Sequence, residues 1–269
     1  MTTAAPVSMR TVRATRYVTA FREGGSLPGL VEADDDGMYV VKFRGAGQGP
    51  RVLVAEWLAG EIARALGLRV PDLVAVDLVK DLADSEPHQE IHDLLVASVG
   101  RNIGLDFLPG ALTFNPAIDA ADPDWAAAVV WFDGLVTNPD RSPKNPNLLT
   151  WGPNTWLIDH GAALSIHFTW RDPDAHARRS HAERLADHVL MPFASSIEAA
   201  DERLGPLVTP ELLEDLAAAI ADDWLAPDPA IGSPDDQRRA YVTYLLRRLE
   251  APRPFVADAE RLRAAVAPA

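Results

Sequence analysis

The sequence predicts an α+β fold of two lobes, a small β-rich N-terminal lobe with one helix and a larger, mostly helical C-terminal lobe. Two observations support this prediction. The first 45 residues alternate between apolar and polar side chains and are interrupted by acidic and glycine-rich turns. The hydrophobic period then changes to a helical one, which dominates from about residue 110 onward. We expect the lobes to comprise residues 1–106 and 107–269.

Three strands are expected at the N-terminus. Residues 12–21 alternate loosely and stop at a glycine-containing turn. Residues 30–33 form the second strand, which ends at the acidic turn 34–37, and residues 38–43 form the third. The short connections between them favour antiparallel hairpins.

A helix is predicted over residues 51–66, because apolar side chains recur there at helical spacing and Gly67 follows at the usual C-terminal position. Two further strands are expected at residues 73–79 and 92–99, which are rich in aliphatic residues. The polar stretch 81–90 between them is predicted to be a surface loop.

The second lobe is predicted mainly from helix start signals. Asp122 precedes a proline in the first helical turn, and Ser233 with Asp236 forms a capping box. The expected elements are a helix from 122 to about 135, a loop over 137–147, strands over 148–151 and 155–158, a helix from 209 with apolar residues in register as far as Trp224, and a helix from 233.

Composition excludes several classes of function. The 269 residues contain no cysteine, so disulfides, thiolate metal sites and cysteine nucleophiles are excluded. The net charge of −14 disfavours binding to nucleic acid or to anionic membranes. Neither a signal peptide nor an apolar stretch of membrane-spanning length is visible, so we expect a cytoplasmic protein.

A glycine turn lies between the first two expected strands. In the turn of Gly24, Gly25 and Ser26, the two glycines have no Cβ atom, which would allow the backbone to approach a phosphate group closely. The alternative is an ordinary hairpin turn, which the same residues would also favour.

Lys42 is unusual because it lies in an otherwise apolar strand, and burying an ammonium group without a partner is costly. It is followed by a helix that carries Glu56 and Glu61, an order that resembles the lysine–glutamate pair of kinases. Either glutamate fits the spacing. The alternative is that Lys42 faces solvent on one side of the sheet.

Two segments of the second lobe carry the polar residues that phosphoryl transfer requires. The loop after the long apolar helix places Asp140 and Asn145 five residues apart, as in kinases, where the aspartate orients the hydroxyl and the asparagine binds metal. The following hairpin ends in Asp159, beside His160 and Gly161, which is the position of the second metal ligand. Each segment alone is also compatible with an ordinary turn.

The sequence resembles the HipA-like serine/threonine kinases of bacterial toxin–antitoxin systems in three segments. Their N-x-D-x-x-x-K-N loop is matched by residues 138–145, their Gly-Ser-x-Pro phosphate loop by residues 25–28, and their helix pattern by residues 56–68. The resemblance covers about residues 24–165, and it favours Glu56 over Glu61 as the partner of Lys42. The toxin kinases carry an additional N-terminal β-rich segment, for which this chain is too short.

The resemblance implies a two-lobed, protein-kinase-like fold that binds ATP and Mg²⁺. It implies Asp140 as the catalytic base, Lys144 near the transferred phosphate, and Asn145 and Asp159 as the metal ligands. For the nucleotide, it implies that Lys42 with Glu56 contacts the α- and β-phosphates, that Gly24, Gly25 and Ser26 cover the phosphates, and that the hinge that contacts adenine contains Phe107 and Leu108. The Arg141 that follows Asp140 is also similar to the Asp-Arg loop of phosphoinositide-type kinases.

Four functional hypotheses follow. The first is an ATP-dependent phosphotransferase that acts on a hydroxyl group, with a protein serine or threonine as acceptor. The second keeps the same cleft but has a small-molecule acceptor, such as a sugar, an antibiotic or a lipid. The third is a pseudokinase that binds ATP without catalysis, and the fourth is a metal-dependent hydrolase that uses His160, His167 and Asp159. No residue of the chain points to an antitoxin-type partner.

Overall fold

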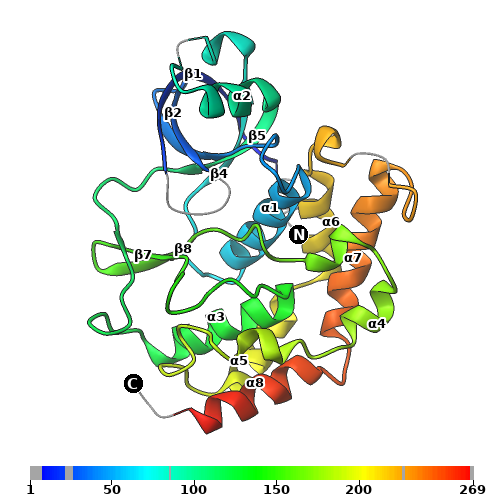
Figure 1. Ribbon diagram of the computed structural model, residues 1–269. Coiled ribbons are helices and arrows are strands. Elements are labelled where there is room, and N and C mark those ends of the chain that lie inside the picture. The colour runs from blue at the N-terminus through cyan, green and yellow to red at the C-terminus, as the bar shows by residue number, and fades with distance from the viewer. Residues whose placement is uncertain (1–7, 22–26, 85, 226–227, 267–269) are drawn as a thin grey trace, which may run out of the picture.

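The first part of the chain folds as a closed barrel (Figure 1). The computed structural model describes residues 8–21, 27–84, 86–225 and 228–266. Neighbouring strands run antiparallel, except β1 and β4, whose parallel pairing closes the barrel. In barrel order the strands are β1 (Thr11–Ala20), β2 (Gly29–Ala33), β3 (Met38–Lys42), β5 (Gly100–Asp106) and β4 (Leu73–Leu78). The three strands predicted before residue 45 are thereby confirmed.

Alternate side chains of each strand fill the barrel interior. On β3, Tyr39 and Val41 point inward, and Phe43, which follows the strand, joins the same cluster. Because successive side chains of a strand point to opposite faces, Lys42 leaves the barrel on its outer side. It is nevertheless buried, because α1 (Arg51–Ala65) packs against that side.

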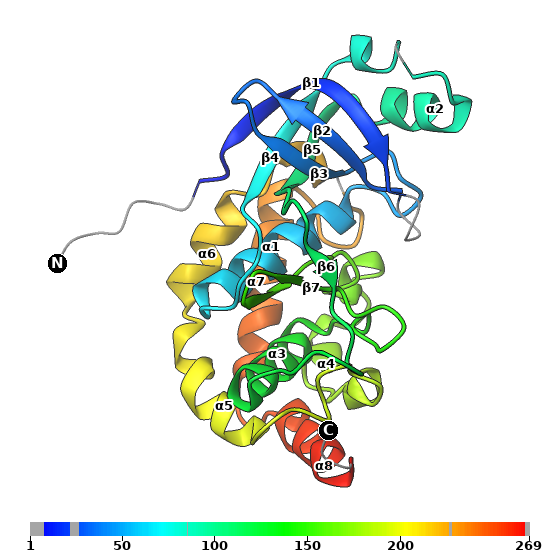
Figure 2. The same ribbon diagram turned by 90° about the vertical axis from the view of Figure 1, so that its left-hand side faces the viewer.

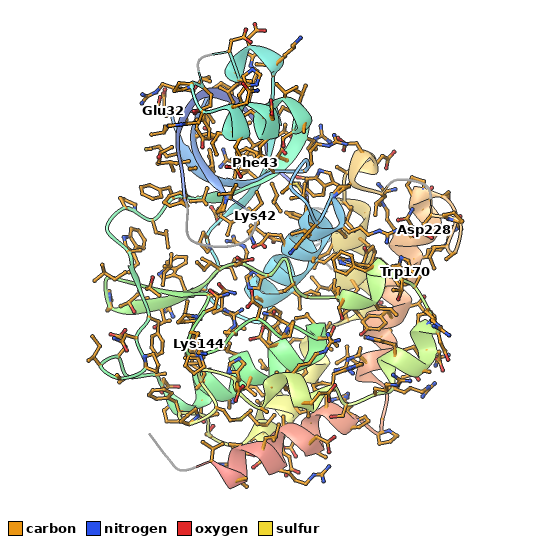
Figure 3. The ribbon with its side chains drawn as sticks, in the orientation of Figure 1. Glu32, Lys42, Phe43, Lys144, Trp170 and Asp228 are labelled. Carbon is orange, nitrogen blue, oxygen red and sulfur yellow. The ribbon has the colours of Figure 1, made fainter. Side chains whose placement is uncertain are left out.

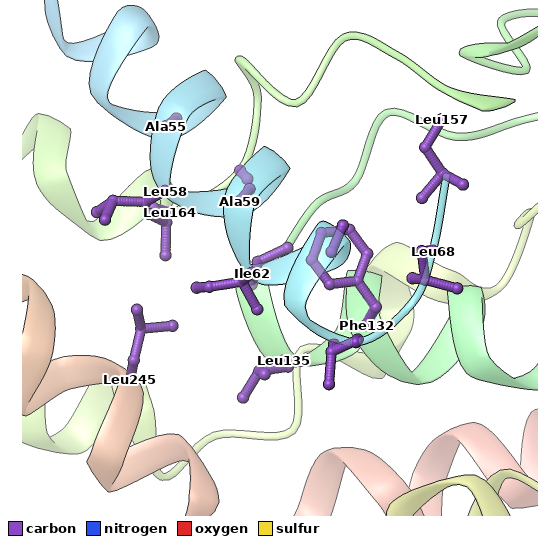
Figure 4. Packing of buried hydrophobic residues seen from close by; sticks show 14 of the residues in the cluster. Ala55, Leu58, Ala59, Ile62, Leu68, Phe132, Leu135, Leu157, Leu164 and Leu245 are labelled. Carbon is purple, nitrogen blue, oxygen red and sulfur yellow. The ribbon is translucent and has the colours of Figure 1, made fainter. Parts of the chain in front are cut away.

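Helix α1 lies between the barrel and the helical lobe (Figures 1 and 2). Residues 52–60 of this helix are all buried, so this stretch is enclosed by protein on every side, although it contains the charged Glu56. Ile62 belongs to the same buried cluster as Phe132 and Leu135 of the helical lobe, and the three residues are labelled in Figure 4. Gly60 allows β4 to approach, because a Cβ atom there would come within 2.6 Å of a methyl group of Leu73. The predicted helix is confirmed.

The strand predicted at residues 92–99 is wrong. This segment belongs to the helix α2 (Gln89–Ala97), and the strand β5 begins only at Gly100. The aliphatic residues that suggested a strand follow helical spacing instead, with Ile91, Leu94 and Leu95 packed on the end of the barrel. Val96 is 40% exposed. Tertiary packing therefore decided the structure of a segment that β-propensity alone misassigned.

The helical lobe is built around α3 (Pro123–Val136), which begins where Asp122 accepts a hydrogen bond from the backbone of Trp125. Its remaining elements are β6 (Leu112–Thr113), β7 (Leu148–Trp151), β8 (Asn154–Leu157), α4 (Pro173–Ala177), α5 (Ile197–Leu204), α6 (Pro210–Ala218), α7 (Pro234–Leu249) and α8 (Pro254–Ala265). Short 3-10 helices are η1 (Lys80–Leu82), η2 (Ser165–Phe168), η3 (Ala182–Leu185), η4 (Gly205–Leu207) and η5 (Asp222–Trp224). Among the described residues, no helix is long and apolar enough to cross a membrane.

Helix α6 is shorter than its apolar pattern suggests. The side chains of Ile220 and Trp224 are buried as predicted, but the helix ends at Ala218 and Trp224 lies in η5. The turn carries Trp224 to the barrel, where its indole N–H donates to the carbonyl oxygen of Arg101 at 2.9 Å. The same periodicity thus serves two short elements instead of one long helix.

Several histidines of the helical lobe occupy buried positions. His181 and His188 are both buried. The fully buried His167 has its Nδ1 atom 3.0 Å from the hydroxyl group of Tyr241. Burial lowers the pKa of His167 to about 3, with a smaller contribution from the charge of Arg51.

This buried His167 predicts a pH dependence of stability. In the unfolded chain the imidazole titrates near 6.5, so as pH falls below 6.5 the unfolded state takes up a proton that the folded state excludes. We expect His167 to cost about 1.4 kcal/mol of unfolding free energy for each pH unit between 6.5 and its lowered pKa. Urea unfolding at several pH values between 7.5 and 5 measures this slope. His167→Gln should flatten it, and an unchanged slope in this variant would contradict the assignment.

Candidate active site

Lys42 and Glu56 form a buried ion pair between the barrel and α1. The Nζ atom of Lys42 lies 2.5 Å from Oε2 of Glu56, and both side chains are buried. Burial alone would raise the pKa of Glu56, but Lys42 and a hydrogen bond from His160 outweigh it and lower this pKa to about 2. Burial would likewise lower the pKa of Lys42, yet its carboxylate partners raise it above the ordinary value. Both groups are therefore charged at neutral pH.

The structure settles which glutamate faces Lys42. Glu61, the alternative from the sequence, lies on another side of α1 and contacts Arg64 at 3.4 Å. Because residues five apart in a helix are separated by about 140° around the axis, only one of the two can face the barrel lysine. That residue is Glu56.

Asp159 joins this pair from the helical lobe. Its Oδ1 atom lies 2.5 Å from Nζ of Lys42, and its side chain is 38% exposed. The chain turns sharply after β8, because Asp159 adopts a left-handed backbone conformation with φ of 55°. Gly161 then passes so close to α1 that a Cβ atom would lie 2.5 Å from a methyl group of Val52. Three segments that are distant in sequence thus meet at Lys42.

A second polar group lies in the loop that follows α3. The Nδ2 atom of Asn145 donates to Oδ1 of Asp140 at 2.9 Å. Asn147 donates to the backbone carbonyl oxygen of Asp140 at 2.5 Å, and its own backbone carbonyl oxygen accepts a hydrogen bond from Ile158 at 3.1 Å. Since Ile158 directly precedes Asp159, Asn147 connects the loop of Asp140 to the segment of Asp159.

The loop is anchored by the buried Asp133 of α3, a residue that is not among the site residues predicted from the sequence. The carboxylate of Asp133 accepts hydrogen bonds from Arg141 Nε at 2.6 Å and from Asn138 Nδ2 at 2.9 Å. The guanidinium of Arg141 also donates to the carbonyl oxygen of Asn147 at 2.5 Å. Arg141 therefore holds the two ends of the Asp140 loop together.

His188 completes the anchor in a defined neutral tautomer. Its Nδ1 atom accepts from the backbone N–H of Leu190 at 3.1 Å, so its Nε2–H donates to Asp133 at 2.9 Å. Burial lowers the pKa of His188, which keeps the ring neutral. Burial would raise the pKa of Asp133, but Arg141 and His188 outweigh it and keep this pKa below the ordinary range. A carboxylate in an otherwise apolar helix was the sequence signal for this anchor.

The structure also gives the positions of three further predicted site residues, Phe107, Leu108 and Lys144. The backbone N–H of Phe107 donates to Met38 of β3 at 2.9 Å, and Leu108 is buried after β5. Lys144 is exposed in the helical lobe, below Lys42 in the view of Figure 3. The glycine turn, Gly24, Gly25 and Ser26, lies outside the described residues.

The donor set fits a magnesium ion shared with phosphate oxygens. Hard oxygen ligands are required, and Mg²⁺ is commonly held by one or two protein side chains together with substrate phosphates. Lys42 uses Oδ1 of Asp159, and no hydrogen bond from the described residues reaches Oδ2. Asn145 donates through its nitrogen, so its side-chain oxygen is available. In the described part of the chain, no three His, Cys, Asp or Glu side chains gather as a metal site by themselves.

Comparison with solved structures identifies the class of fold. The crystal structure of the Helicobacter pylori proinflammatory kinase CtkA is similar, with a TM-score of 0.51 at 11% sequence identity. The similarity covers 94% of this chain and 100% of that chain. The two-lobed, kinase-like fold predicted from the sequence is thereby confirmed. No curated protein matches the sequence.

The sequence profile of the HipA-like kinases matches residues 15–255. The match covers most of the chain, including both lobes and every described site residue named above. The chain therefore belongs to the HipA-like kinase family, and it is a phosphotransferase. The family implies ATP as the phosphoryl donor.

Proposed function

We propose that this protein transfers the γ-phosphoryl group of ATP, with Mg²⁺, to the hydroxyl group of a protein serine or threonine. The observation that carries the proposal is the meeting of Lys42, Glu56 and Asp159 beside the Asp140 loop. A positive side chain, a free carboxylate oxygen and a second carboxylate are the groups that phosphoryl transfer needs.

Each predicted site residue has a role in this proposal. Lys42, oriented by Glu56, binds the α- and β-phosphates, and Asp159 and Asn145 hold the metal. The ion, when bound, neutralises the phosphate charge that develops during transfer. Asp140 accepts the proton of the attacking hydroxyl, and Lys144 stabilises the transferred phosphate. Gly24, Gly25 and Ser26 cover the phosphates, while Phe107 and Leu108 contact adenine.

A small-molecule acceptor on the same site is the second candidate. The exposed position of Lys144 beside the Asp140 loop suits an anionic group on either kind of acceptor. A non-catalytic ATP-binding module is less consistent with the site, since Asp140, Asn145 and Asp159 would then have no chemical task. Labelling with γ-labelled ATP distinguishes the acceptors, because label on serine or threonine of protein supports the first candidate and label only on small molecules supports the second.

Nucleotide binding is the direct test of the proposal. With ATP and Mg²⁺ at about 100 times the dissociation constant, we expect stabilisation by about 2.7 kcal/mol, seen as a rise in melting temperature. Asp159→Asn should lose most of the magnesium-dependent part of this rise, because it removes the charge on the free carboxylate oxygen.

The exposed Asp187, also in the helical lobe, provides the matched control, and Asp187→Asn should respond as the wild type does. Absence of any shift in the wild type would overturn the proposed function. A full magnesium-dependent shift in Asp159→Asn would overturn only the assignment of Asp159.

A further inference from the structure

His160 contacts both oxygens of the Glu56 carboxylate. Its backbone N–H donates to Oε2 at 2.8 Å, and its Nδ1 atom lies 3.4 Å from Oε1. Oε2 is also the atom that accepts the hydrogen bond from Lys42. The residue next to Asp159 therefore holds the glutamate that orients Lys42.

The imidazole of His160 is fixed on its other side as well. The side chain is fully buried, and its ring stands edge-on to Phe132 of α3, with centroids 5.8 Å apart and an interplanar angle of 77°. The carbonyl oxygen of His160 accepts a hydrogen bond from Ala163 at 2.9 Å. The ring is thus clamped between α1 and α3.

This clamp matters because the preceding backbone is strained. Asp159 has a φ of 55°, a left-handed conformation that is costly for a residue with a Cβ atom and persists only where the surroundings enforce it. Lys42 holds the Asp159 side chain, and His160 and Gly161 hold the chain that follows against α1. Loosening His160 would allow Asp159 to relax away from Lys42.

We propose that the His160 imidazole is a positioning residue for phosphoryl transfer, which holds Glu56 so that Lys42 and Asp159 stay in the arrangement that receives nucleotide and metal. The inference rests on the proposed function above. An apolar ring at this position would fill the same space but would leave Oε1 of Glu56 without its side-chain contact. The polar character of the ring, rather than its volume, is therefore the property that activity depends on.

Two substitutions separate these properties. His160→Phe keeps the ring and its packing on Phe132, whereas His160→Asn loses volume but keeps a donor near the position of Nδ1. For His160→Phe we expect the magnesium concentration for half-maximal rate to rise, or kcat to fall, by about 10–100-fold, the range typical of losing a contact that orients a side chain of the site from outside. His160→Asn should stay nearer the wild type. The reverse order would show that packing alone matters and would overturn the proposal.

A measurement without nucleotide or metal tests the contact itself. Melting temperatures of Glu56→Gln, His160→Phe and the double variant form a double-mutant cycle. We expect the double variant to lose clearly less than the two single losses together, because Glu56→Gln weakens the same contact that His160→Phe removes. Additive losses would overturn the proposal. If the wild type proved inactive with ATP and Mg²⁺, the proposed function would fail, while this cycle would still decide whether the imidazole holds Glu56.

Discussion

Asp140→Asn is expected to reduce kcat for phosphoryl transfer by about 10²–10⁴-fold, the usual contribution of a general base. The change keeps the size of the side chain but removes its charge and its ability to accept a proton, and it replaces one of the two oxygens that accept hydrogen bonds from Asn145 and Asn147 with an NH2 group. Binding of ATP with Mg²⁺ should change much less than kcat, because Asp140 is assigned to the acceptor and hydrogen-bonds to neither Lys42 nor Asp159; of the groups assigned to nucleotide and metal, Asn145 is the one that it contacts.

Steady-state rates test the expected fall in kcat, and nucleotide-induced thermal shifts measured on the same preparation test the expected binding. Asp187→Asn, which makes the same chemical change at an exposed position, should keep the wild-type rate. Transfer by Asp140→Asn within tenfold of the wild type would exclude Asp140 as the base. A loss of nucleotide binding instead of kcat would place Asp140 among the ligand-binding groups.

Local patterns explain why much of the architecture could be predicted from the sequence. The change from alternation to helical spacing near residue 51 marks the passage from the barrel to α1, and capping residues such as Asp122 and Ser233 mark helix starts. These signals are local, so they can be recognised in the sequence without knowledge of the fold. Closure of the barrel depends on the pairing of β1 with β4, about 60 residues later in the chain, and no local pattern encodes that pairing.

The candidate site likewise contains residues that local patterns predict and residues whose role depends on the folded structure. Lys42, Asp140 and Asp159 were visible because a charged residue in an apolar strand, a polar turn and a strand end are local anomalies. The choice between Glu56 and Glu61 needed the direction in which α1 faces the barrel. The glycine turn stays a prediction, since Gly24 to Ser26 lie outside the described residues.

The partners of Asp133 show most clearly which contacts cannot be predicted from the sequence. A carboxylate in an apolar helix must have partners, because burying an unpaired charge is very costly. Which residues supply them cannot be read from spacing, because Arg141 and His188 lie 8 and 55 residues further along the chain. The position of the Asp140 loop thus depends on contacts that only the folded chain creates.

Arg141→Met is therefore expected to lower the unfolding free energy by about 3–5 kcal/mol, the usual cost of leaving one member of a buried ion pair alone. Asp133 would keep Asn138 and His188 as partners but would lose its positive counterpart. Urea unfolding at pH 7 measures the loss. Transfer should also fall, since the two ends of the Asp140 loop would no longer be joined through the guanidinium.

Two further variants show whether the loss comes from the buried charge. The exposed pair of Arg178 and Asp174 is the matched control, and Arg178→Met should cost less than about 1 kcal/mol because exposed ion pairs contribute little. The double variant Asp133→Leu with Arg141→Met removes both charges and should recover part of the stability lost by Arg141→Met alone. It should not recover activity, because the loop is still unanchored. A double variant no more stable than Arg141→Met would show that the unpaired charge of Asp133 does not dominate the loss, and that the contacts of Asp133 with Asn138 and His188 matter as much.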